Sequence, residues 1–226
     1  MDRQADRVSG RGGHGPRCAG LGLALLSIAA LGCALRSAPE PPVVPEDSRA
    51  AVAVVERLQA VVLDLMKNAE RLGYDGRVRT LTPVVRQSFD LPSMVRRTLG
   101  PSWRSLGQDQ KRVWLDTFER FHVSAIADIR DAYAGQAFVV LGAQRDARGH
   151  VRVHTQLDYP GRQVDIFTDY LLKGTTQGWL IFDVFKPPTV SEVTMRRAEY
   201  ATVFEKRGFE QVLSAMEARI LRNQQP

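Results

Sequence analysis

Cysteine is almost absent from this chain and is confined to one end of it. The 226 residues contain two cysteines, Cys18 and Cys33, and none follows Cys33. The rest of the chain therefore has no disulfide bond, no thiolate metal site and no cysteine nucleophile. The absence excludes these three kinds of cysteine chemistry, but it does not indicate the cellular compartment. A folded domain can be stable in an oxidising compartment without disulfide bonds.

The sequence also lacks the short motifs that carry much of enzyme chemistry. It contains no G-x-S-x-G turn, no P-loop, no glycine pattern for dinucleotides and no H-E-x-x-H metal motif. His150 and His154 fall on the polar side of one predicted strand without a carboxylate partner, which is a weak metal signal. His122 stands beside an aromatic stripe in a predicted helix and is interpreted as a polar-boundary residue. We predict no metal, no cofactor and no enzyme activity.

Positive charge is concentrated near the N-terminus and is small elsewhere. The formal net charge is +6, and residues 1–38 hold five arginines against two aspartates, which is +3. The remaining residues carry 26 basic and 23 acidic side chains, again +3. A nearly balanced body opposes nucleic-acid binding, which needs a concentrated basic face. The arginine-rich stretches 71–86 and 96–112 are interpreted as solvated helix faces, with a local basic patch as the alternative.

The first 38 residues have the composition of an export signal. A polar, arginine-rich stretch over 1–17 precedes an apolar run over 19–35, and Arg36 ends that run. This order of charge, apolar segment and small residues predicts a secretory signal peptide over 1–38. The run is short for a membrane-spanning helix, and a retained N-terminal anchor is the alternative.

Two kinds of processing fit the end of this segment. The sequence Ala-Leu-Gly-Cys over 30–33 resembles the lipobox of bacterial lipoproteins, and lipidation would make Cys33 the first residue of the mature protein. Cleavage after Ala34 without lipidation is the alternative. Residues 39–47 are rich in proline and acid and are predicted to form a flexible leader.

The first part of the body has helical periodicity. Apolar residues recur every three or four positions over 47–72, 77–89 and 108–133. Asp90 is the expected cap of a further short helix. The helix over 108–133 carries an aromatic stripe, which is either ordinary core or the wall of a cavity. The stripe includes Trp114, Phe118 and Phe121.

From residue 137 the period of the apolar residues changes to two, which is typical of strands. Turns at 146–149, 160–161 and 174–178 separate four such runs. The sequence therefore predicts a four-stranded antiparallel meander, followed by C-terminal helices. N-terminal helices, a meander and then helices again define an α+β fold. A strongly curled sheet of this kind leaves an apolar cavity between the sheet and the helices.

Asp183 is a carboxylate inside a run of large apolar residues, Gly178 to Phe185. A buried carboxylate has to be paired or hydrogen-bonded, or else it stays protonated. We interpret Asp183 as a structural anchor that is hydrogen-bonded to a backbone turn or to an arginine such as Arg196 or Arg197. The alternative is a general base in a small cavity enzyme.

Several motifs follow one another in a characteristic order. Leu-Gly-Pro-Ser-Trp-Arg over 99–104 precedes a Gln-Asp-Gln-Lys-Arg cluster over 108–112. Further on, the run over 178–185 leads to Thr-Val-Ser-Glu-x-x-x-Arg-Arg-x-Glu-Tyr over 189–200. This order resembles the MlaC-like family, also called toluene-tolerance proteins, over residues 50–222. The last motif is most similar to the branch of that family associated with hopanoids.

The resemblance implies a lipid-binding domain over 48–222, located in the periplasm. It implies a monomeric carrier that holds a phospholipid or a hopanoid-type lipid in an apolar cavity, with no cofactor besides this cargo. The implied partners are an inner-membrane transporter complex of ABC type and an outer-membrane donor or acceptor, in the service of outer-membrane lipid asymmetry. The competing interpretations are a structural envelope lipoprotein with Cys33 lipidated, and a cavity enzyme that uses Asp183.

The candidate lining of the cavity is chosen from the faces that the periodicity places inward. Trp103, which follows a Gly-Pro turn, is interpreted as a lip of the pocket. Basic residues at the mouth would suit a lipid phosphate. The candidate lipid-binding residues are Leu99, Trp103, Trp114, Phe118, Phe121, Val153, Leu157, Ile166, Tyr170, Ile181 and Tyr200.

Overall fold

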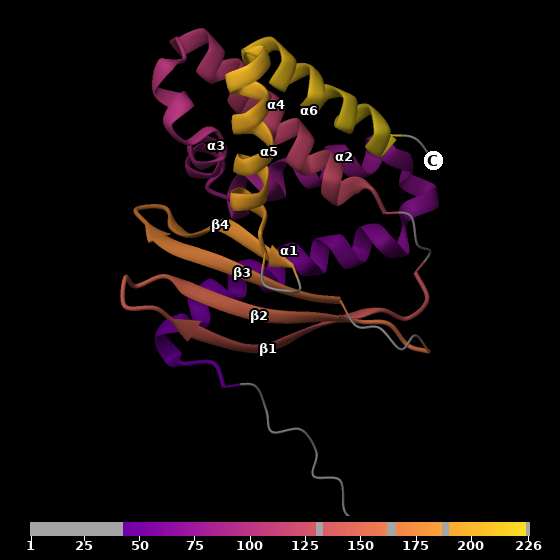
Figure 1. Cartoon of the computed structure of the whole chain (residues 1–226). Helices are drawn as coiled ribbons and strands as arrows, with labels where there is room; N and C mark the ends of the chain where they lie inside the picture. The colour runs from indigo at the N-terminus through magenta and orange to yellow at the C-terminus, as the bar shows by residue number, and fades with distance from the viewer. Residues whose placement is uncertain (1–42, 130–132, 162–165, 187–189, 225–226) are drawn as a thin grey trace, which may run out of the picture. The chain divides into compact units, whose positions relative to one another are not determined.

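The computed structural model describes residues 43–129, 133–161, 166–186 and 190–224, which belong to one compact unit (Figure 1). No helix in these ranges is both long enough and apolar enough to cross a membrane. The predicted signal peptide and Cys33 lie outside the described residues. Those predictions therefore stand as the sequence makes them.

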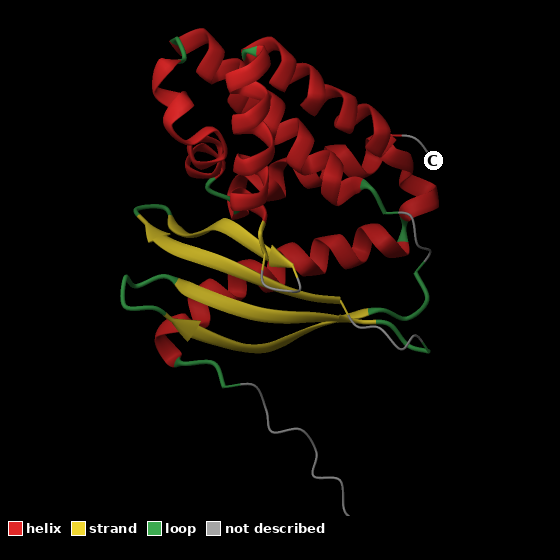
Figure 2. Cartoon of the chain, in the orientation of Figure 1, coloured by secondary structure: helices red, strands yellow, loops and turns green. Residues whose placement is uncertain are grey.

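The described ranges contain six α-helices and two short 3-10 helices. The bounds are η1 (Glu46–Ser48), α1 (Arg49–Lys67), α2 (Ala69–Ser88), α3 (Leu91–Leu99), η2 (Gly100–Ser105), α4 (Gln108–Ala127), α5 (Glu192–Arg207) and α6 (Phe209–Gln224). Helix α1 crosses one face of the sheet, and the remaining helices gather in a layer beyond one edge of it (Figure 2).

The described part of the sheet has five antiparallel strands in chain order. They are β1 (Ala137–Arg145), β2 (Val151–Asp158), β3 (Ile166–Thr175), β4 (Gly178–Lys186) and β5 (Val190–Ser191). Neighbours pair in the order β1-β2-β3-β4-β5, and the sheet is not closed. The predicted α+β class and meander are confirmed.

The predicted number of four strands is wrong. Strand β5 is the addition, and it pairs Ser191 with Phe185 and Val190 with Lys186 directly before α5 begins. A strand of two residues has no alternation that a sequence can reveal, because one period of a strand already takes two residues. The pairing depends on the chain turning back along β4.

The first predicted helix is shorter than its apolar pattern. The pattern over 47–72 predicts one helix, but α1 ends at Lys67 and α2 begins at Ala69. Within α2 the chain kinks at Gly73, where φ is 59° and ψ is −178°. Glycine adopts this backbone conformation at little cost. The apolar period continues through the break because the residues on both sides of it face the same core.

Two helix ends depend on side chains. Asp90 caps α3 as predicted, since its carboxylate accepts a hydrogen bond from the backbone N–H of Ser93 at 3.1 Å. The helix predicted to reach residue 133 ends at Ala127, where Arg77 Nε donates to the carbonyl oxygen at 2.8 Å. Such a donor satisfies a helix-terminal carbonyl. This partner is 50 residues away in sequence, so the local period could not predict the end.

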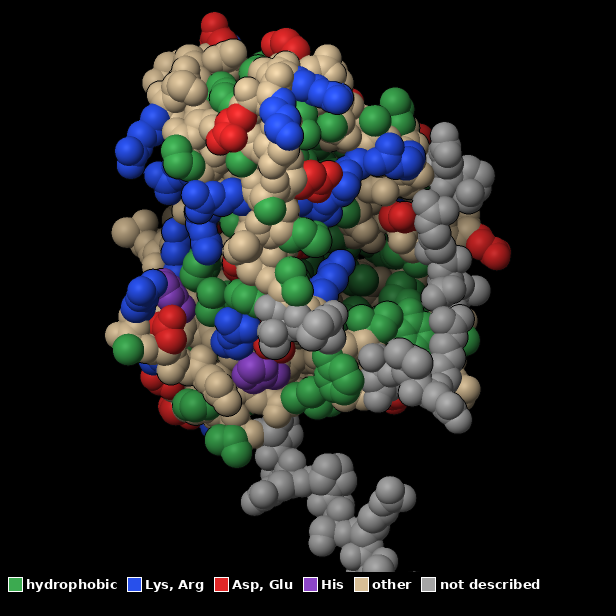
Figure 3. All heavy atoms as spheres, viewed as in Figure 1, with side chains coloured by type: hydrophobic (Ala, Val, Ile, Leu, Met, Phe, Trp, Pro, Cys, Tyr) green, Lys and Arg blue, Asp and Glu red, His purple; other side chains and the backbone are tan. Residues whose placement is uncertain are grey.

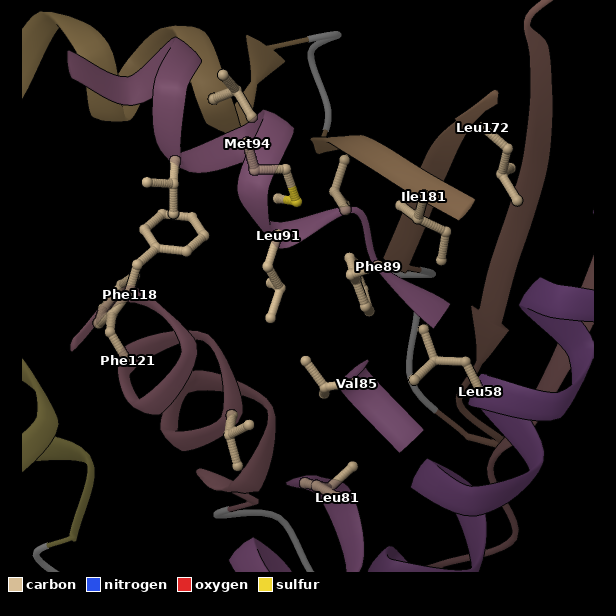
Figure 4. Close-up of a cluster of buried hydrophobic side chains, with 14 of the residues drawn as sticks. Leu58, Leu81, Val85, Phe89, Leu91, Met94, Phe118, Phe121, Leu172 and Ile181 are labelled. Carbon is tan, nitrogen blue, oxygen red and sulfur yellow. The ribbon is translucent and has the colours of Figure 1, made fainter. Parts of the chain in front are cut away.

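The helical layer and the sheet share one apolar core. Figure 4 shows side chains of α1, α2, α3 and α4 converging with Leu172 and Ile181 of the sheet. The aromatic stripe of α4 is buried there, and Trp114 has an exposed fraction of 0%. The Trp114 ring meets the Tyr200 ring of α5 edge to face, with centroids 5.4 Å apart. The stripe therefore builds the core of the helical layer.

Candidate functional site

A cavity of about 330 Å³ lies between the sheet and helices α1 and α4. Figure 3 shows the surface hollowed between the helical layer and the sheet, with hydrophobic side chains beside the hollow. All four long strands and three helices contribute to the wall. The lining residues are Leu58, Gln59, Val62, Phe89, His122, Ala125, Ile126, Phe138, Leu157, Ile166, Thr168, Tyr170, Val184, Lys186 and Glu192.

The wall is mostly apolar, and its charged groups gather on one side. Lys186 is the last residue of β4 and Glu192 is the first residue of α5. Both lie near enough to His122 of α4 for their charges to act on the pKa of its imidazole. An apolar cavity with a few convergent polar groups is the usual form of a site for an amphipathic small molecule.

His122 is held as a neutral side chain in this wall. It is buried, its ring meets Phe89 edge to face at 4.5 Å, and it stacks on Phe118 at 6.0 Å. Burial lowers the pKa of His122 below its ordinary value, and the positive charge of Arg196 acts in the same direction while Glu192 opposes it. The imidazole is therefore uncharged at neutral pH.

Acid should destabilise the wild-type protein more than a His122→Phe variant. The unfolded chain protonates this histidine below its ordinary pKa of 6.5, whereas the folded state protonates it only at a lower pH. The unfolded state then binds more protons than the folded state. The free energy of unfolding therefore falls as the pH is lowered, by at most about 1.4 kcal/mol per pH unit. Urea titrations at about pH 7 and about pH 5 measure the difference. An equal fall in both proteins would show that His122 is not excluded from water.

Tyr170 of β3 is the second polar aromatic of the wall. Burial raises the pKa of Tyr170 to about 12, against a smaller lowering by the side chain of Gln59. Its hydroxyl is therefore protonated at neutral pH and is available as a hydrogen-bond donor. Gln59 of α1 and Tyr170 thus add neutral polar groups to the wall of the cavity.

The structure divides the eleven candidate lipid-binding residues among three places. Leu157, Ile166 and Tyr170 line the cavity. Trp103 lies at a separate groove on the surface. The others are buried in the shared core, with exposed fractions of 3% or less, and none of them lines the cavity in the described structure. These seven are Leu99, Trp114, Phe118, Phe121, Val153, Ile181 and Tyr200.

The groove at Trp103 has three basic side chains among its lining residues. It has a volume of about 530 Å³ and includes Arg96, Lys111 and Arg112 among its lining residues. The Lys111 ammonium group lies 5.6 Å from the centre of the Trp103 ring. Trp103 and this part of the arginine-rich stretch 96–112 therefore form a local basic patch, the alternative that the sequence left open, away from the cavity.

Sequence reasoning missed most of the cavity wall. Leu58 and Val62 are four residues apart on α1 and show the helical period, which marks an inward face without telling cavity from core. Phe138 is detectable as the partner of Leu157 across the β1–β2 pair. The sequence gives no indication that Gln59 lines the cavity, because a single glutamine among apolar residues is not part of a repeating pattern.

Asp183 is an anchor between β4 and α5. One carboxylate oxygen accepts hydrogen bonds from the backbone N–H groups of Val184 at 2.9 Å and Val193 at 3.2 Å, and the other accepts from Ser191 Oγ at 2.6 Å. The arginine beside it is Arg97, at 3.7 Å, so the expected partners on α5 were the wrong arginines. Asp183 does not line the cavity as described.

The fold and the cavity together define a class of protein: an α+β domain with a small, mostly apolar cavity that has charged groups on one side. A model of the MlaC protein family matches residues 56–218. The chain belongs to the MlaC family.

The fold is also that of a solved structure. A phospholipid-binding protein from Ralstonia solanacearum, in complex with a phospholipid, superposes with a TM-score of 0.61 and is 18% identical in sequence. The alignment covers 76% of this chain and 98% of the other. No curated protein matches the chain.

Proposed function

We propose that the protein is a periplasmic carrier that holds the acyl chains of a phospholipid-type lipid in the cavity between α1, α4 and the sheet. The observation that carries this proposal is a mostly apolar cavity with charged groups on one side, in a chain of the MlaC family. The bound phospholipid of the Ralstonia protein, which has the same fold, supports it. A carrier of this kind needs no covalent step.

The cavity removes the main cost of keeping a lipid outside a membrane. Its volume of about 330 Å³ holds roughly ten groups of about 30 Å³, the space that one water takes in the liquid. A methylene is of similar size, and moving each one out of water gains about 0.8 kcal/mol. Roughly ten methylenes therefore contribute about 8 kcal/mol, which is ample for sequestering part of one chain. A complete phospholipid requires the sheet and the helices to move apart.

The polar side of the cavity suits the head group. Lys186 is exposed at the end of β4 and still lines the cavity. An ammonium group there can pair with a lipid phosphate in a charge-assisted hydrogen bond while the acyl chain enters between Leu58 and Ile166. We place the phosphate at Lys186 and the acyl chain toward α1 and β3.

Transport between the two envelope membranes is the finer part of the proposal. The described residues belong to a small domain whose cavity can carry a lipid but offers no means of driving it in one direction. Direction therefore has to come from an inner-membrane transporter complex and an outer-membrane donor or acceptor. A hopanoid-type lipid is the alternative cargo, since a polycyclic hydrocarbon can use the same apolar wall.

Transfer between vesicles tests the carrier function. Donor vesicles that contain a fluorescent phospholipid are mixed with unlabelled acceptor vesicles, with and without the protein. The protein should accelerate the appearance of label in the acceptor vesicles in proportion to its concentration. A folded protein that retains lipid but does not accelerate transfer would be a storage protein, and the proposal of shuttling would be wrong.

A further inference from the structure

Two buried nitrogen atoms of the cavity wall have no partner in the structure as described. Neither Gln59 Nε2 nor His122 Nε2 has a hydrogen-bond partner, and both residues line the cavity. The Gln59 side chain does act on the Tyr170 hydroxyl and lowers its pKa, but an amide nitrogen has two N–H donors, so one remains for a ligand. Gln59 and His122 are 4% and 5% exposed, respectively. They come from different helices, α1 and α4, which face the same space.

Such atoms are rare in folded proteins. Buried polar side-chain atoms nearly always have a hydrogen-bond partner, and an exception calls for an unrecorded ligand, ion or water. Leaving a buried donor unpaired weakens the fold, and an apolar residue at either position would remove that cost. Polar groups at these two positions of an otherwise apolar wall therefore point to a polar atom supplied by the ligand.

The chemistry of the surroundings limits what that ligand atom can be. The Gln59 amide nitrogen is always a donor, and the neutral imidazole of His122 donates from Nε2 in the tautomer that has its proton on that nitrogen, which is the tautomer the proposal requires. The charges of Glu192, Arg196 and Lys186 all act on His122. Glu192 and Arg196 lie 3.6 Å apart and offset each other, and Lys186 is the partner proposed for the lipid phosphate. A neutral oxygen acceptor fits these groups better than a carboxylate or a phosphate does.

We propose that Gln59 and His122 donate hydrogen bonds to an acyl-ester carbonyl oxygen of the lipid, which makes the cavity selective for ester-linked lipids over ether-linked lipids and hydrocarbons. This inference rests on the proposed carrier function. In a phospholipid the ester carbonyl groups stand between the phosphate and the chains, and His122 lies near enough to Lys186 for that charge to act on its pKa. A carbonyl oxygen has two lone pairs and accepts from both donors.

The test compares two phospholipids that differ only in the linkage. A diacyl lipid and its dialkyl ether analogue, with equal chain lengths and the same head group, compete for delipidated full-length protein. Bound lipid is then measured by mass spectrometry. The wild-type protein should prefer the ester by about tenfold, the effect of about one net hydrogen bond.

Three variants locate the preference. Gln59→Leu and His122→Phe should each bind less ester lipid and leave ether binding unchanged, so that the preference falls toward unity. His154→Phe is the matched control, because His154 Nε2 is also buried and unpaired but belongs to a residue that does not line the cavity. This variant should keep the full preference.

The possible results distinguish a failure of this inference from a failure of the proposed carrier function. Equal binding of both lipids by the wild-type protein would overturn the inference and leave the carrier function standing. A preference that survives in both Gln59→Leu and His122→Phe would also overturn it. Binding of neither lipid would overturn the carrier function itself. If one variant does not fold, the other variant and the wild-type comparison still test the inference.

Discussion

Replacing Thr168 with tryptophan should remove bound lipid and leave the protein folded. Thr168 lies on β3 and lines the cavity, so an indole at this position would fill space that the acyl chain needs. Tryptophan is the largest side chain and buries about 150–250 Å² of surface, so an indole at this position would occupy much of the cavity. Because the new side chain enters open space, the free energy of unfolding should change by less than about 1 kcal/mol.

The neighbouring residue provides a matched control. Phe167 precedes Thr168 on β3, so its side chain points to the opposite face of the sheet, and it is 43% exposed. Phe167→Trp introduces the same indole one residue away, and it should retain lipid at the wild-type level. Lipid content is measured by solvent extraction of equal amounts of the two folded variants. Equal lipid content in both would show that the cargo does not occupy this cavity.

The second large effect is expected at Asp183, and it concerns stability rather than binding. Asp183→Asn should lower the free energy of unfolding by about 2 kcal/mol, since the amide nitrogen that replaces one carboxylate oxygen cannot accept a hydrogen bond. Either the Ser191 hydroxyl or the backbone N–H groups of Val184 and Val193 then lose their acceptor. In a domain of this size that corresponds to a fall of about 4–8 °C in the melting temperature. The lipid content of the folded fraction should remain unchanged.

A surface aspartate on the same sheet serves as the control for Asp183. Asp158 ends β2 and is exposed, so Asp158→Asn should change the free energy of unfolding by no more than about 0.5 kcal/mol. Thermal unfolding of both variants, followed by circular dichroism, measures the effect. An Asp183→Asn protein as stable as the wild type that no longer functions would contradict the anchor role, and it would favour the cavity-enzyme alternative.

The parts of the fold that the sequence predicts are those set by local periods. The meander follows from alternation within each strand, and the buried stripe of α4 follows from its spacing. The end of α4 at Ala127 depends on a hydrogen bond from Arg77, and β5 depends on pairing with the end of β4. Both require contacts between segments that no local period encodes.

The cavity was harder to predict than the fold, for a physical reason. The core and the cavity wall consist of the same apolar and aromatic residue types. The inward-facing position of a residue therefore does not show whether it packs in the core, as Trp114 does against Tyr200, or lines the cavity, as Leu157 does. The distinction depends on how far the sheet curves away from α1 and α4. The polar exceptions, Gln59 and His122, distinguish the cavity wall from the core, and they become recognisable only once the space beside them is known.

The most direct test of the central claim is the identification of lipid in the purified protein. The chain is expressed in a bacterium, purified from the periplasm without detergent and extracted with organic solvent, and the released lipids are identified by mass spectrometry. The account predicts ester-linked phospholipid in a fixed ratio to the protein. A well-folded protein that releases no lipid, and that takes none up from vesicles, would contradict it.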